Sequence, residues 1–180
     1  MPHPDAWRAF PLMQLPLRDS SHEETCVVCR DIWWRSAMAY HEATHATVAL
    51  DLGLGVEFVA IDEAKEIEVT KLEASLYPLI KAGMKIPALA TRLDERSLRT
   101  APRAVLVSMV APSCVVTGMP QVDEYAAIEA TIGAERAKRL DLDPDEILDE
   151  AKLIVSKGVV QDRVLALATD LAKSGWVDLA

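Results

Sequence analysis

Cysteine, glycine and aromatic residues are all scarce in this 180-residue chain, which holds three cysteines, seven glycines and 5% aromatic residues. An odd and small number of cysteines excludes a disulfide scaffold and fits a reducing compartment such as the cytosol. Cys26 and Cys29 form a Cys-x-x-Cys pair, but no second pair completes the four ligands of a structural zinc site. We interpret both as small core residues on a helix.

The chain also lacks a basic excess and an unbroken apolar run. Its formal net charge of −9 disfavours nucleic acid and anionic membranes as partners, because long-range repulsion opposes them. The longest uncharged run, residues 104–122, is interrupted by Pro112, Gly118 and Pro120, so it predicts a buried helix and a turn, not a membrane span. The N-terminus has no basic segment before an apolar core, so we expect a cytoplasmic protein.

What is present is enough apolar sequence, 51% of the residues, to build one hydrophobic core. Residues 1–20 are rich in proline and predict an irregular N-terminal arm, and residues 21–180 predict a single domain. Helical periodicity or capping signals predict helices over residues 21–52, 97–116, 123–140, 144–157 and 159–173. Residues 56–62 and 66–72 have strand character. The pattern favours a predominantly helical α+β fold with a small sheet.

The most specific pattern is His41-Glu42-Ala43-Thr44-His45, a match to H-E-x-x-H within the first predicted helix. Residues four apart lie on one face of a helix, so both imidazoles can reach one metal ion. Glu42, the next residue round the helix, can take a proton from a metal-bound water. We therefore predict His41 and His45 as metal ligands and Glu42 as the catalytic base. Catalytic zinc usually takes three protein ligands, so a third must come from elsewhere in the chain.

The segment from Ala39 to Ala49, followed by the predicted strand, resembles the FtsH-type zinc metalloproteases, whose motif region reads A-Y-H-E-A-G-H-A. The chain departs from that pattern at Thr44, where the family has glycine, and around Pro112. It has no room for the AAA+ ATPase of that family. The resemblance implies a zincin-like peptidase domain that binds Zn²⁺. Oligomeric state is left open, because ring assembly in that family involves the absent ATPase.

The same resemblance implies that the third zinc ligand is Asp123, an aspartate at the start of a helix. Glu124 and Glu129 are the nearest substitutes, since a carboxylate oxygen is an acceptable zinc ligand. An acid in the first turn of a helix is also stabilising without any metal. A thermolysin-like arrangement would instead use Glu63 or Glu66, which we rank lower because they lie in strand-like sequence.

These residues predict a zinc-dependent metallopeptidase, a hydrolase in which Glu42 activates a zinc-bound water. Its expected partners are peptides or unstructured protein segments, which could pair with the predicted strand over residues 66–72. The alternative is a non-catalytic domain that keeps the peptidase fold as a binding or regulatory module.

Overall fold

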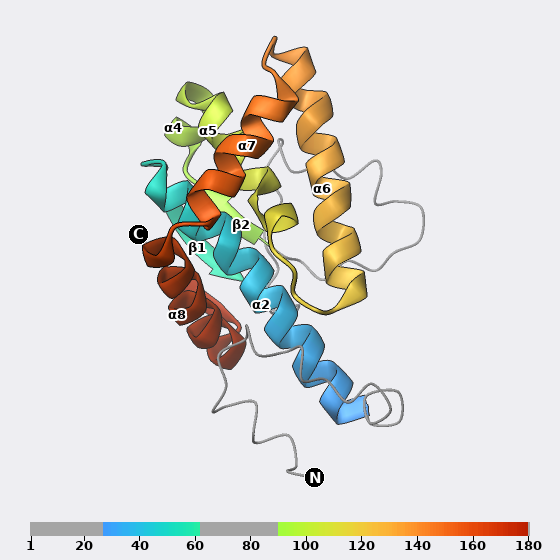
Figure 1. Ribbon diagram of the computed structural model, residues 1–180. Helices are drawn as coiled ribbons and strands as arrows, with labels where there is room; N and C mark the ends of the chain where they lie inside the picture. The colour runs from blue at the N-terminus through green and yellow to red at the C-terminus, as the bar shows by residue number, and fades with distance from the viewer. Residues whose placement is uncertain (1–26, 62–89, 180) are drawn as a thin grey trace.

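The computed structural model describes residues 27–61 and 90–179, and within them the side chains of residues 34–61 and 91–179. This part of the chain is mostly helical with one small antiparallel sheet (Figure 1), which confirms the α+β class at a coarse level. The helices are α2 (Val27–Asp51), α4 (Glu95–Thr100), α5 (Pro102–Val110), the 3-10 helix η4 (Ala111–Cys114), α6 (Pro120–Arg139), α7 (Pro144–Val155) and α8 (Gly158–Ser174). The strands are β1 (Val56–Ala60), β2 (Ala90–Leu93) and β3 (Trp176–Asp178).

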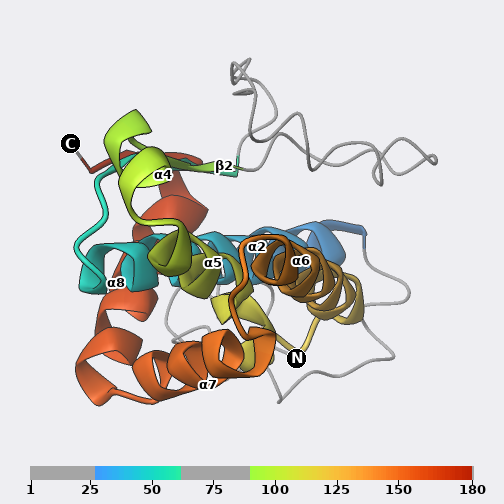
Figure 2. The same ribbon diagram turned by 90° about the horizontal axis from the view of Figure 1, so that it is seen from above.

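Helix α2 carries the motif and runs through the middle of the described structure. Seen from above, the sheet lies on one side of α2 and α7 on the other (Figure 2), and α5 and α6 each contact both α2 and α7. The sequence indicates one apolar stripe on this helix, yet every residue from Ser36 to Ala49 is buried. Alanine occupies five of these positions (37, 39, 43, 46 and 49), and its small side chain lets neighbouring elements approach on all sides. The two motif histidines are therefore inside the molecule.

The sheet has the strand order β2-β1-β3, with both pairs antiparallel. β1 lies within the strand predicted over residues 56–62. β3 was not predicted, because three residues are too few to show an alternating pattern. In the β1–β2 pair, Thr91 lies opposite Val59, which places the start of β2 beside α2. The strand predicted over residues 66–72 lies outside the described residues.

The single helix predicted over residues 97–116 is wrong, because the chain forms α4, α5 and η4 there. Proline explains the first break: Pro102 has no N–H to continue the helix, and the preceding Ala101 adopts φ −133° and ψ 53°. A second proline, Pro112, lies where α5 gives way to η4. After the break, α5 packs against α2, and the carbonyl of Ser108 in its last turn reaches His45.

The C-terminal helices agree with their sequence signals. Asp143 caps α7 by accepting a hydrogen bond from the backbone N–H of Asp145. Helix α8 ends at Gly175, which adopts the left-handed conformation with φ 74°. The turn at Gly175 leads directly into β3 and so returns the chain to the sheet.

Within residues 27–61 and 90–179, none of the helices has the length and apolar character that crossing a bilayer requires.

Candidate metal centre

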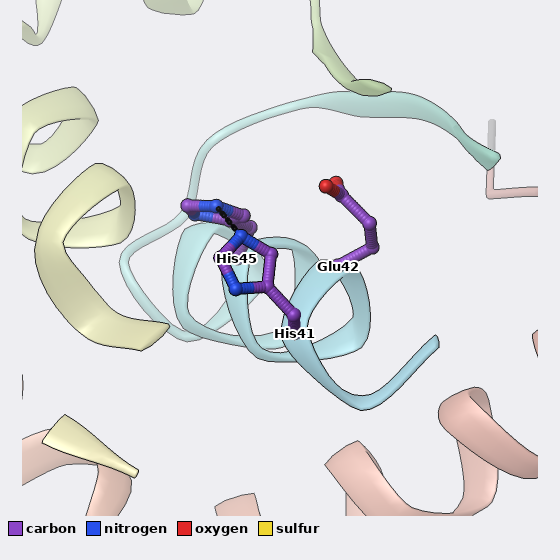
Figure 3. A group of neighbouring side chains, drawn as sticks. All are labelled: His41, Glu42 and His45. Atoms are coloured by element: carbon purple, nitrogen blue, oxygen red, sulfur yellow. Dashed lines mark hydrogen bonds between the residues drawn. The ribbon is translucent and has the colours of Figure 1, made fainter. Parts of the chain in front are cut away.

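The two motif histidines meet at their Nε2 atoms. His41 is fully buried and His45 is 9% exposed. Their ring centroids are 4.8 Å apart, the rings are nearly perpendicular at 80°, and the two Nε2 atoms are 3.2 Å apart. Figure 3 shows both rings on one side of α2, joined by that contact. The helical spacing has therefore placed two nitrogen donors side by side, as the motif predicts.

A third donor comes from Glu129 on α6. Its Oε2 lies 2.9 Å from Nε2 of His41 and 3.2 Å from Nε2 of His45. The three atoms thus form a nearly equilateral triangle. Tetrahedral zinc with ligands at 2.0–2.1 Å requires neighbouring ligand atoms about 3.3–3.4 Å apart. The triangle is only slightly tighter than one face of that tetrahedron, so the two nitrogens and one oxygen fit a zinc ion with its fourth position free.

The sequence of α6 explains how Glu129 reaches the histidines. Tyr125, Glu129 and Gly133 follow one another at intervals of four and share a face of the helix. A Cβ atom at Gly133 would press against the side chain of Val110, so its absence lets α6 lie close to α5. One turn before Glu129, the ring of Tyr125 lies 5.3 Å from that of His41. This face of α6 is therefore built to pack against the motif.

A backbone carbonyl orients the second imidazole. Nδ1 of His45 is 2.8 Å from the carbonyl oxygen of Ser108 on α5. A carbonyl only accepts, so Nδ1 carries the hydrogen and donates it, which leaves Nε2 as the atom available to a metal in the neutral ring. His41 has no equivalent bond: its Nδ1 is the buried side-chain atom without a partner in the described part of the chain. Its ring is placed instead by the contact of Nε2 with Glu129 and by ring contacts with His45 and Tyr125.

The Glu42 carboxylate is turned toward the sheet and stands apart from the contact between the two imidazoles (Figure 3). It is 3% exposed, and Thr91 on β2 donates a hydrogen bond to its Oε2 at 3.0 Å. One atom of Glu42, one of His41 and one of His45 nevertheless lie within 4.8 Å of one another. Burial raises the pKa of the Glu42 carboxyl above its ordinary value, and this effect outweighs the nearby histidines. A carboxylate beside the metal position with a raised pKa suits a general base.

The charges at the centre are strongly coupled in the absence of a metal. Burial alone would lower the pKa of His45, but the charge and hydrogen bond of Glu129 raise it to about 9. Burial alone would raise the pKa of Glu129. The two histidines outweigh burial and hold the pKa of this carboxyl well below its usual range. Without a metal, the carboxylate of Glu129 therefore favours the protonated form of His45, and a divalent cation would fit the same place.

The structure does not bring the expected third ligand, Asp123, to the histidines. Its Oδ1 accepts two hydrogen bonds of 2.8 Å from Thr117, one from the backbone N–H and one from the hydroxyl. Asp123 thereby ties the first turn of α6 to the preceding loop. Glu124 is exposed on the same helix. Glu129, two turns further along and named only as a substitute, is the carboxylate that contacts both imidazoles.

Three further residues of the centre were not predicted from the sequence. Thr91, Ser108 and Tyr125 carried no signal, although Tyr125 could have been found from its spacing of four before Glu129. Glu63 and Glu66, the lower-ranked ligands, lie outside the described residues. The same holds for Cys26 and for the side chain of Cys29.

No family model matches this chain, and no curated protein and no solved structure is significantly similar to it. The likeness to FtsH-type proteases therefore stays a prediction from the residues around His41. The geometry of the centre stands independently of that likeness.

Proposed function

We propose that this protein is a zinc-dependent metallopeptidase whose metal is held by His41, His45 and Glu129. The observation that carries the proposal is the triangle of Nε2, Nε2 and Oε2 atoms with edges of 2.9, 3.2 and 3.2 Å. Two imidazoles and one carboxylate are the ligand set of several catalytic zinc sites, which keep one position open for water or substrate. The zinc ion would lower the pKa of its water toward neutrality and polarise the carbonyl of the scissile peptide bond.

The protein's own residues supply the remaining chemistry. Glu42 accepts the proton of the attacking water and delivers it to the leaving amine, as a general base and then a general acid. Burial raises its pKa above the ordinary value, which favours that exchange. Thr91 keeps the carboxylate in one orientation through the 3.0 Å hydrogen bond. Ser108 keeps Nε2 of His45 directed at the metal position.

Peptides or unstructured protein segments are the substrates we propose, because an extended backbone is needed to reach a base and a metal site that both lie inside the molecule. The described residues include nothing that would unfold a structured substrate. This part of the proposal is tested by comparing an unfolded casein with a folded globular protein of similar size.

The decisive experiment measures metal and hydrolysis on the same samples. Wild type, Glu42→Gln and the control Glu135→Gln are purified and analysed for zinc, then assayed with a quenched peptide and with casein. Glu135 is an exposed glutamate on α6 whose partner is Lys138, so its loss should not affect the centre. We expect about one zinc per chain in all three. The rate in Glu42→Gln should fall by a factor of about 10² or more, as for removal of a general base.

Each alternative result has a definite meaning. Equal hydrolysis by Glu42→Gln and Glu135→Gln would assign the activity to a contaminant. Absence of zinc in wild type after incubation with the metal would reject the metal centre. Zinc without hydrolysis of any peptide would support the non-catalytic binding domain in place of the peptidase.

A further inference from the structure

Pro112 is linked to the metal centre through the backbone carbonyl of Ser108. Four residues separate it from Ser108, whose carbonyl accepts the hydrogen bond from Nδ1 of His45 at 2.8 Å. In an α-helix the carbonyl of residue 108 is the acceptor for the N–H of residue 112. Proline has no N–H. The residue type at position 112 therefore decides whether a backbone N–H of the helix can bond to the carbonyl oxygen of Ser108.

The backbone around Pro112 keeps the helical path on which such a bond would form. Val110 has φ −86° and ψ −11°, and Ala111 has φ −55° and ψ −39°, both in the right-handed region. The nitrogen of residue 112 follows this right-handed course, so an N–H there would face the preceding turn, toward the carbonyl of Ser108 in the α-helical pattern and that of Met109 in the 3-10 pattern. The pyrrolidine ring also crowds the carbonyl four residues earlier and turns it away from the helix axis. Both effects leave the Ser108 oxygen directed at His45.

Among the described side chains, His45 is the one that bonds to the carbonyl oxygen of Ser108. Ser108 is 4% exposed, and its own hydroxyl bonds to the carbonyl of Val105, not to the histidine. Pro112 is fully buried, so the surrounding packing fixes its ring in place. Nδ1 of His41 has no hydrogen-bonded partner in the described residues, so the Ser108 carbonyl is the group that fixes an Nδ1 atom of the two imidazoles there.

We propose that Pro112 is a positioning residue of the metal centre: by withholding a backbone N–H, it frees the Ser108 carbonyl to fix the Nδ1–H form of His45. This inference rests on the metal site proposed above for its functional consequence, but the hydrogen bond itself can be tested without metal. It also gives a physical reason for the proline that distinguishes this segment from the FtsH-type pattern.

The test compares two residues at position 112 that differ in one group. Pro112→Val restores a backbone N–H with a side chain of similar size. α-Hydroxyisovaleric acid at the same position, introduced by nonsense suppression, keeps the valine side chain but replaces the N–H with an ester oxygen. Pro102→Ala, at the exposed start of α5, controls for the loss of a proline from this helix.

Two readouts are used. In the zinc-free protein, nitrogen-edited proton NMR follows the Nδ1–H of His45, and hydrogen exchange follows the backbone N–H that Pro112→Val restores. We expect that restored N–H to be protected and the slowly exchanging His45 proton to be lost in Pro112→Val, while the ester variant regains the His45 proton. In zinc competition titrations, Pro112→Val should bind zinc about 10–100-fold more weakly, the usual cost of removing such a partner. The ester variant and Pro102→Ala should bind as wild type does.

Three results would overturn the inference. The first is a protected backbone N–H at position 112 of Pro112→Val together with an unchanged His45 proton, since the carbonyl would then serve both donors. The second is an ester variant as defective as Pro112→Val, which would point to packing alone. The third is wild-type zinc affinity in Pro112→Val. If wild type binds no zinc, the proposed function fails, while the NMR comparison still decides the role of Pro112.

Discussion

Thr91 and Glu42 are 49 residues apart in the chain, yet the threonine hydroxyl lies 3.0 Å from Oε2 of the glutamate and 3.1 Å from its backbone carbonyl oxygen. The contact joins the edge of the sheet to the motif helix at the residue proposed to move the proton. Because Glu42 is buried, this hydrogen bond sets the direction of its carboxylate.

Thr91→Val should impair the chemical step while leaving the metal in place. Valine has the shape of threonine but cannot donate, and a hydrogen bond to a charged group is worth about 1.5–3 kcal/mol. We expect kcat to fall roughly 10-fold or more by that energy, with little change in KM. Thr91→Ser should restore most of the rate. Steady-state kinetics with zinc analysis checks this, and an unchanged kcat in Thr91→Val would remove Thr91 from the mechanism.

Glu129→Gln and Asp123→Asn should separate the two candidate third ligands. Loss of a carboxylate that binds zinc directly weakens the metal by a factor of about 10² or more, while loss of a helix-start hydrogen bond costs about 1 kcal/mol of stability. We expect the first effect in Glu129→Gln and only the second in Asp123→Asn. Glu124→Gln, exposed on the same helix, is the matched control.

Zinc titration by competition with a chromogenic chelator measures these affinities, and urea unfolding measures the stabilities. Zinc lost in Asp123→Asn and retained in Glu129→Gln would reverse the assignment and support the ligand implied by the FtsH-type resemblance.

Removal of zinc should lower the thermal midpoint. A ligand at 1,000 times its Kd stabilises the folded state by about 4 kcal/mol, and 1 kcal/mol corresponds to about 2–4 °C in a domain of this size. We expect chelation to lower the Tm by roughly 8–16 °C by these figures, and added zinc to restore it. Calorimetry should find no such shift in the double variant His41→Ala, His45→Ala. A similar shift there would place the stabilising metal elsewhere.

The zinc-free protein should lose stability at alkaline pH. The pKa of His45 rises from 6.5 to about 9 on folding, so its proton favours the folded state. That contribution is complete below pH 6.5 and disappears as the pH rises through about 9. The pKa of Glu129 is lowered from 4.5, so its contribution is present above pH 4.5 and is lost on acidification.

Urea unfolding in the presence of a chelator, from pH 5 to pH 10, follows the His45 contribution, and an extension of the series below pH 4.5 follows that of Glu129. In Glu129→Gln the loss of stability between about pH 6.5 and pH 9 should largely vanish, because the charge that raises the pKa of His45 is gone. An identical pH profile for this variant and wild type would contradict the coupling of the two residues.

Local features of the sequence predicted much of the helical framework. Asp143 before Pro144 and the glycine at position 175 mark helix ends that the structure contains. These signals succeed because they act between residues close in the chain. The predicted helix over residues 97–116 failed because Pro102 and Pro112 interrupt an apolar run whose hydrophobicity says nothing about backbone hydrogen bonds.

The placement of the two histidines and of Glu42, the proposed base, was predictable for the same local reason: a helix repeats every 3.6 residues, so the spacing of His41, Glu42 and His45 dictates their relative directions. The sequence by itself determined that much. The third candidate ligand, Glu129, and the contacts of Ser108 and Thr91 were decided only when α6, α5 and β2 packed around α2. Several acids stood at plausible positions on one helix, and only the close approach of α6 at Gly133 selects Glu129 among them.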